Sequence, residues 1–154
     1  MAVPVNLNRP FDPRLFLMDQ ELDRAAGLLM AGANALAQAG ETARKKAGLS
    51  KPELQILMAA RYRPGQTVSE MRTSLGMTVP TFARLIGQLD ARGLIERARE
   101  TSDARRRKLT LSDAGTTLTT PIAIEVREHL RLAFRASGPD AAAGVRALLE
   151  ALVK

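Results

Sequence analysis

The sequence of 154 residues contains no cysteine, no tryptophan and a single histidine, His129. Without cysteine the chain forms no disulfide, no thiolate zinc site and no cysteine-based redox sensor. One histidine cannot build a histidine-rich metal site, so we expect neither a metal nor a cofactor. Aromatic residues make up only 3%. The core must therefore consist mainly of Leu, Ala, Val, Ile and Met, a composition that favours helices over sheets.

Long apolar runs are also missing. The longest mildly apolar stretch, residues 25–39, is too short to span a bilayer. Residues 1–12 lack a basic segment followed by an apolar one, so we expect no signal peptide. The sequence contains no nucleophile motif, no phosphate-cradling glycine loop and no metal-binding cluster, so nothing in it indicates an enzyme. These observations predict a cytoplasmic, non-catalytic protein with no membrane partner.

The charge is positive and unevenly distributed. The net charge is +7, and residues 84–108 hold eight Lys and Arg against four Asp and Glu, which leaves a local charge of +4. An excess of this kind indicates an anionic partner, and charge by itself does not choose between nucleic acid and a membrane surface. A solvated basic surface has the same composition.

Spacing and capping residues predict mostly helices. Apolar residues three and four apart predict one long helix over residues 12–47, which would begin at Asp12-Pro13. Two shorter helices broken near Gly32 or Gly40 are the alternative. Capping boxes at Ser50-Glu53 and Thr67-Glu70 begin the next two helices. Residues 113–135 and 139–153 form the last two predicted helices, with Pro121 placed to kink or delay the first of them.

The middle of the chain has the pattern of a winged helix-turn-helix. Helix 67–75, a tight turn at Gly76 and helix 78–92, capped by Thr78, have the required size. Two short strands, 94–99 and 108–111, follow and flank a turn-prone segment, 100–106. The predicted fold class is mainly α (α+β), a winged helix-turn-helix with a two-stranded wing between long N- and C-terminal helices.

Helix 78–92 is the candidate DNA-recognition helix. Its apolar face predicts burial of Phe82, Leu85, Ile86 and Leu89, and its other face shows Thr78, Pro80, Thr81, Arg84 and Gln88. Residues near the start of such a helix meet base edges in the major groove. Arg84 could pair with guanine and Gln88 with adenine or phosphate. The two threonines suit phosphate or thymine-methyl contacts.

The wing, residues 99–108, carries the basic run Arg105, Arg106 and Arg107 at or just after its tip. A narrow minor groove attracts such arginines through its negative potential. Asp103 could orient one guanidinium by an ion pair, or it could be an ordinary turn residue.

Residues 48–115 resemble the MarR family of bacterial transcription regulators. The resemblance lies in "LGMTVPTFARLIGQLDARGLIER" and "DARRRKLTLSDAG". Ala104 departs from the family, because it stands where the first wing arginine usually sits; Pro80, Ala83, Gly87 and Ser112 are further departures. The resemblance implies a DNA-binding regulator, most simply a repressor, with a changed operator preference.

The apolar faces of the terminal helices predict a homodimer that reads a pseudo-palindromic double-stranded operator. The domain division expected is 1–48 arm and first dimerisation helix, 49–112 DNA-binding domain, and 113–154 C-terminal dimerisation helices. The resemblance also implies a small aromatic or anionic effector, whose candidate lining residues are Met30, Met58, Tyr62 and His129. The alternatives are a winged-helix protein-interaction module and a sequence-indifferent architectural DNA binder.

Overall fold

The computed structural model describes residues 14, 16–100 and 103–153, with the side chains of residues 98–107 outside that description. Contacts divide the chain into two compact units. Unit 1 comprises residues 1–39 and 129–154, and unit 2 comprises residues 40–128. The three segments expected from the sequence remain a prediction about function, because compactness alone does not assign a task to each segment.

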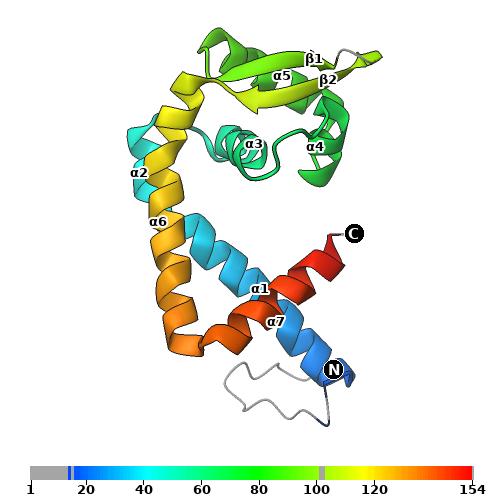
Figure 1. Cartoon of the computed structure of the whole chain (residues 1–154), viewed down its shortest axis with the longest axis vertical. Coiled ribbons are helices and arrows are strands. Elements are labelled where there is room, and N and C mark those ends of the chain that lie inside the picture. Colours follow the sequence, from blue (N-terminus) through cyan, green and yellow to red (C-terminus); the bar gives the residue numbers. More distant parts are fainter. Residues whose placement is uncertain (1–13, 15, 101–102, 154) are drawn as a thin grey trace. The chain divides into compact units, whose positions relative to one another are not determined.

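Unit 2 holds the winged helix, whose elements are drawn in Figure 1. Its helices and strands, in chain order, are α2 (Glu41–Lys46), α3 (Lys51–Tyr62), α4 (Val68–Ser74), α5 (Val79–Ala91), β1 (Ile95–Glu100), β2 (Asp103–Leu111) and the first part of α6 (Asp113–Ser137). The predicted fold class is confirmed.

Both predicted capping boxes are present and fix where α3 and α4 begin. The Ser50 amide donates to the Glu53 carboxylate at 2.8 Å, and the Glu53 amide donates back to the Ser50 hydroxyl at 3.4 Å. The corresponding distances for Thr67 and Glu70 are 2.8 and 3.2 Å. Each box satisfies two amides that the first helical turn would otherwise leave without partners.

The core of unit 2 lies where these elements meet. Its side chains with almost no exposed surface are aliphatic or sulfur-containing apart from one threonine: Ile56, Leu57, Met71, Leu89, Leu109, Thr119 and Ile122. α3, α4, α5, β2 and α6 each contribute at least one of them. The apolar residues therefore fix the position of α5 from its inner face and leave its outer face exposed.

The wing differs from the prediction in length. β1 and β2 pair antiparallel from Ile95–Leu111 to Arg99–Arg107, and the register shifts before the Glu100–Asp103 pair. The second strand thus begins at Asp103 rather than at residue 108, and only residues 101 and 102 separate the strands. The predicted turn over 100–106 was wrong because ladder pairing continues through the polar segment. A single bridge between Thr67 and Lys108 also ties β2 to the start of α4.

Unit 1 consists of α1 (Asp19–Ala39), the end of α6 and α7 (Pro139–Leu152). The single helix predicted over 12–47 was wrong. The alternative of a break near Gly40 is confirmed, since α1 ends at Ala39 and α2 begins at Glu41. A Cβ on Gly40 would lie only 2.7 Å from the Ile122 Cγ2 atom, so close packing against α6 accompanies the break. The predicted cap at Asp12-Pro13 falls outside the described residues.

Pro121 does not delay α6, which runs continuously from Asp113 to Ser137. The Ser112 hydroxyl accepts a bond from the Gly115 amide at 3.0 Å, so it caps this helix. Within the described residues, no helix has the length and apolar character that crossing a membrane requires.

Candidate nucleic-acid interface

α5 is an amphipathic helix at the surface of unit 2. Phe82, Leu85, Ile86 and Leu89 are buried, as predicted. The predicted outward set is exposed along its whole length, and comprises Thr78, Pro80, Thr81, Arg84 and Gln88. Burial of one face therefore aims a mixed polar face away from the protein.

The turn between α4 and α5 is short and internally braced. Gly76 has φ +62°, a left-handed conformation that residues with a Cβ rarely adopt. The Met77 amide donates to the Arg72 carbonyl at 3.2 Å, and the Arg72 guanidinium donates to the Met77 carbonyl at 3.1 Å. These bonds set the angle at which α5 leaves α4.

Thr78 occupies the N-cap of α5 but makes no side-chain bond to the helix backbone. Its hydroxyl donates instead to the Thr81 hydroxyl at 2.9 Å. The predicted capping role is therefore corrected: the backbone takes the N-cap conformation, while the hydroxyl pairs along the exposed surface.

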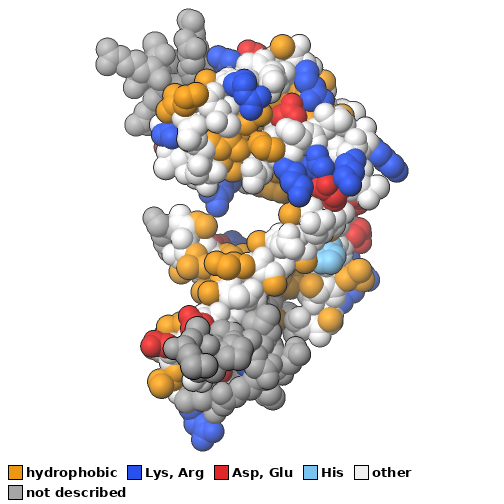
Figure 2. Space-filling model, turned by 180° about the vertical axis from the view of Figure 1, so that it is seen from behind, with side chains coloured by type: hydrophobic (Ala, Val, Ile, Leu, Met, Phe, Trp, Pro, Cys, Tyr) orange, Lys and Arg blue, Asp and Glu red, His pale blue; other side chains and the backbone are white. Residues whose placement is uncertain are grey.

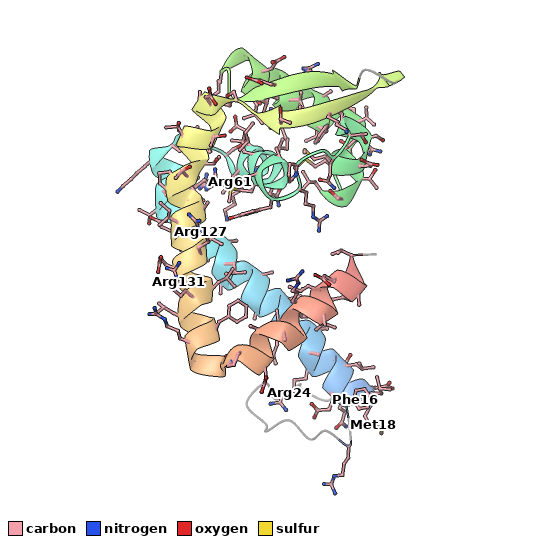
Figure 3. All side chains as sticks on the ribbon, viewed as in Figure 1. Phe16, Met18, Arg24, Arg61, Arg127 and Arg131 are labelled. Atoms are coloured by element: carbon pink, nitrogen blue, oxygen red, sulfur yellow. The ribbon has the colours of Figure 1, made fainter. Side chains whose placement is uncertain are left out.

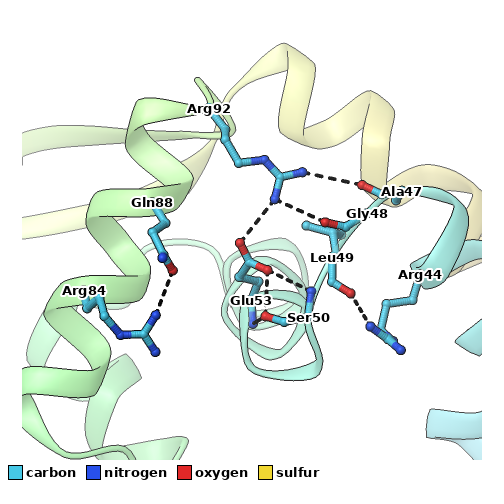
Figure 4. Close-up of polar contacts among 9 residues, drawn as sticks. All are labelled: Arg44, Ala47, Gly48, Leu49, Ser50, Glu53, Arg84, Gln88 and Arg92. Carbon is cyan, nitrogen blue, oxygen red and sulfur yellow. Dashed lines mark hydrogen bonds and ion pairs between the residues drawn. The ribbon is translucent and has the colours of Figure 1, made fainter.

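The two strongest candidate base-reading side chains lie together. Arg84 donates to the Gln88 amide oxygen at 3.1 Å, one helical turn away (Figure 4). The bond holds one guanidinium nitrogen and leaves other N–H donors available, because a guanidinium carries five. The pair thus forms a pre-positioned donor edge on α5.

The far end of α5 is held by a second arginine. Arg92 donates to the Glu53 carboxylate at 3.2 Å and lies 3.5 Å from the carbonyl oxygens of Ala47 and Gly48 (Figure 4). The bonds from Ser50 and from Arg92 outweigh the effect of burial and lower the pKa of Glu53. Asp90 adds a 3.1 Å ion pair to Arg97 of β1. Both ends of α5 are consequently fixed by bonds that the sequence analysis did not identify.

A groove of about 740 Å³ borders α5 and was not foreseen. Its lining comes from α4 and its N-cap, α5 and β1: Thr67, Val68, Ser69, Glu70, Arg72, Val79, Phe82, Ala83, Ile86 and Arg97. Val79 lies at its edge and is 63% exposed. Its spacing from Phe82 and Ile86 is that of a core residue, so no signal in the sequence indicates its exposure.

The predicted wing residues Arg105, Arg106, Arg107 and Asp103 have backbones within β2. Their side chains lie outside the described residues, so their proposed contacts stay predictions. Positive charge nevertheless concentrates in this unit. Residues 40–128 hold 16 of the 23 Lys and Arg and 10 of the 16 Asp and Glu, hence six of the seven net charges.

These features match known proteins. Residues 47–106 match the model of the MarR family. This part of the chain is similar to the MarR family. A curated relative, the HTH-type transcriptional regulator PetP of Rhodobacter capsulatus, is 37% identical over 90 residues, which cover 58% of this chain and 54% of that protein. The chain thus spans about half the length of that relative.

Solved structures extend the MarR-family likeness to the fold of most of the chain. NadR in complex with 4-hydroxyphenylacetate has a TM-score of 0.73 at 22% identity, covering 84% of this chain and 91% of that one. An S. aureus MepR mutant bound to an oligodeoxyribonucleotide has a TM-score of 0.53 at 18% identity, covering 84% and 95%. At such identities the likeness establishes the fold.

The four candidate effector residues do not lie in one unit. Met58 and Tyr62 lie one turn apart on α3 in unit 2, half-buried and exposed respectively. Met30 and His129 belong to unit 1 and are both exposed. None of the four lines the groove beside α5. Among the described residues, no cluster of three or more His, Asp or Glu could hold a metal ion.

Proposed function

We propose that this chain is a cytoplasmic, sequence-specific DNA-binding transcription regulator, most simply a repressor. The observation that carries the proposal is α5: a helix buried on one face, fixed at both ends, and exposing Arg84 and Gln88 on the other. A helix of this form fits the major groove, where a guanidinium reads guanine and an amide reads adenine. The MarR-family match over residues 47–106 supports the same function.

The wing supplies the second contact in this proposal. Arg105, Arg106 and Arg107 follow the two-residue connection of the hairpin and would enter the adjacent minor groove. Asp103 would orient one of them. Minor-groove arginines add affinity that depends less on base sequence than the contacts of α5 do.

The proposed operator is pseudo-palindromic because we propose that the protein acts as a homodimer. All buried apolar side chains of the described residues fall between Ala43 and Ala123, within unit 2. Unit 1 instead exposes large apolar side chains: Phe16, Leu17, Met18, Leu22, Leu28, Met30, Leu132, Val145, Leu148, Leu149, Leu152 and Val153. Orange hydrophobic side chains are seen on the visible face of this unit in Figure 2. A surface of this kind needs a covering partner, and a second copy supplies the same helices.

Selection of duplexes from a random pool by the purified protein tests the function directly. We expect an inverted repeat whose half-sites lie about one helical turn apart. Electrophoretic shifts then compare Arg84→Ala with Lys46→Ala, which removes the same charge from exposed α2. Arg84→Ala should weaken binding to the selected duplex by roughly 1–3 kcal/mol and relax the base preference at one position. Arg105→Ala should lower the affinity for all duplexes by a more similar factor, whatever their sequence.

Three results would contradict the proposal. Wild-type affinity in both arginine variants would remove α5 and the wing from the interface. A steep salt dependence without enrichment of any sequence would favour an architectural DNA binder. Retention of no duplex even at low salt would favour a protein-interaction module.

The proposal includes release from DNA by a small effector. Met58 and Tyr62 on α3 offer an adaptable thioether and an amphipathic ring. Met30 and His129 are separate candidates in unit 1. The aromatic acid 4-hydroxyphenylacetate, present in the NadR structure, is a suitable probe. Addition of this acid should release bound operator from the wild type and release less from Tyr62→Ala. Equal retention of operator with and without the acid would exclude this compound as an effector.

A further inference from the structure

The first turn of α5 has an apolar surface where a base-reading helix usually carries donors. Val79, at the first helical position, is 63% exposed, and the side chains of Pro80, Thr81 and Ala83 are exposed beside it. Among the described residues of unit 2, only Tyr62 and Ile124 are comparably large, apolar and exposed. Folding does not account for the exposure, because Val79 would gain stability by burial.

The exposed face of α5 is divided lengthwise. Residues four apart on a helix lie above one another, so Val79 and Ala83 form one edge and Arg84 and Gln88 form the other. The donor edge contains the 3.1 Å bond between Arg84 and Gln88. The apolar edge borders the groove between α4 and α5. An apolar edge and a hydrogen-bond-donor edge therefore lie side by side on α5, and each can contact a different group on the DNA bases.

Hydrogen-bond donors are scarce on the apolar edge. Val79 and Ala83 have none in their side chains. Pro80, which begins the neighbouring row that holds Arg84 and Gln88, has neither a side-chain nor a backbone donor. The Thr78 hydroxyl already donates to Thr81. Guanine presents only acceptors in the major groove, so this edge offers it little, whereas thymine presents a methyl group.

We propose that Val79, with Pro80 beside it, reads the C5-methyl group of a pyrimidine in the major groove, which is thymine in unmodified DNA. The inference rests on the proposed function and adds to it. The apolar edge selects the methyl, and the donor edge of Arg84 and Gln88 reads a neighbouring base pair. Each half-site should accordingly contain one position where thymine is preferred for its methyl alone.

Replacement of single thymines by deoxyuridine in the selected operator tests the inference, because it deletes the methyl and keeps every hydrogen-bonding group. At one thymine per half-site we expect the wild type to lose affinity about fourfold, the value of one buried methyl. Val79→Ala should bind the thymine operator more weakly than the wild type does. Its affinity should not fall further when deoxyuridine replaces that thymine. 5-Methylcytosine at the same position should restore binding relative to cytosine.

Ile124→Ala is the matched control, since Ile124 is an exposed aliphatic residue of the same unit that lies outside the interface. It should keep the fourfold sensitivity to deoxyuridine. Indifference of the wild type to deoxyuridine at every thymine would overturn the inference and leave the proposed function standing. The same sensitivity in Val79→Ala as in the wild type would assign the methyl contact elsewhere and also overturn it. Failure to select any duplex would overturn the proposed function itself.

Discussion

Gly115 is the residue whose replacement should disturb the winged helix most for the smallest chemical change. It lies in the first turn of α6, where a Cβ would approach the Leu94 carbonyl oxygen to 2.0 Å and its carbonyl carbon to 3.0 Å. That carbonyl also accepts the Ser112 amide at 3.2 Å. Both neighbours are backbone atoms, so no side-chain rotation can make room.

The expected cost of Gly115→Ala follows from these contacts. Relief of the clash requires α6 and the start of β1 to separate by about an ångström, which would weaken the bond from Ser112. Overpacking of this kind costs about 1–3 kcal/mol, and a weakened hydrogen bond adds about 1 kcal/mol. Alanine recovers about 1 kcal/mol through its higher helix propensity. The net destabilisation should be about 2 kcal/mol.

Thermal unfolding followed by circular dichroism measures the effect. A loss of about 2 kcal/mol corresponds to a fall in Tm of roughly 4–8 °C for a chain of this size. Gly87→Ala is the control, because Gly87 is also helical and a Cβ there meets nothing within 4 Å. The control should raise Tm slightly. A Tm of Gly115→Ala equal to or above that of Gly87→Ala would refute the reasoning.

Three further predictions concern polar contacts of unit 2. Arg61 of α3, labelled in Figure 3, donates to the Thr119 hydroxyl of α6 at 3.0 Å. Arg61→Ala should therefore lower the free energy of unfolding by about 1–2 kcal/mol, and an unchanged midpoint of urea unfolding would contradict this. Arg44 lowers the pKa of Glu41 from 4.5 to about 2. The stabilising contribution of Glu41 is therefore present above pH 4.5 and lost as the pH falls toward 2, and a carboxyl NMR titration midpoint near 4.5 would disprove it. Arg92→Ala should lower stability by at most about 1 kcal/mol, because its ion pair is partly exposed; a larger loss in thermal unfolding would show that its bonds do more than an ordinary surface pair.

Local signals predicted the winged helix well. The boxes at Ser50-Glu53 and Thr67-Glu70 formed as expected because each involves atoms within one helical turn. The buried face of α5 was also predictable, since an amphipathic helix beside a core has only one way to bury Phe82 and Leu89.

Contacts between distant residues were not predictable in the same way. The break at Gly40 accompanies its close approach to Ile122, 82 positions later in the sequence. The wing strands extend into a polar segment because each strand supplies the other's backbone partners, and turn-forming residues did not prevent this. Val79 has core spacing and is nonetheless exposed, because no element among the described residues covers the start of α5.

The hydrogen bonds around Ser112 have a consequence for local opening. The Ser112 hydroxyl donates to the Gly93 carbonyl at 2.6 Å and accepts from the Gly115 amide, while its own amide donates to Leu94. One residue thus connects the start of the wing, its end and the first turn of α6. Hydrogen exchange at the amides of Ser112 and Gly115 should therefore occur at a common free energy, as a single cooperative unit.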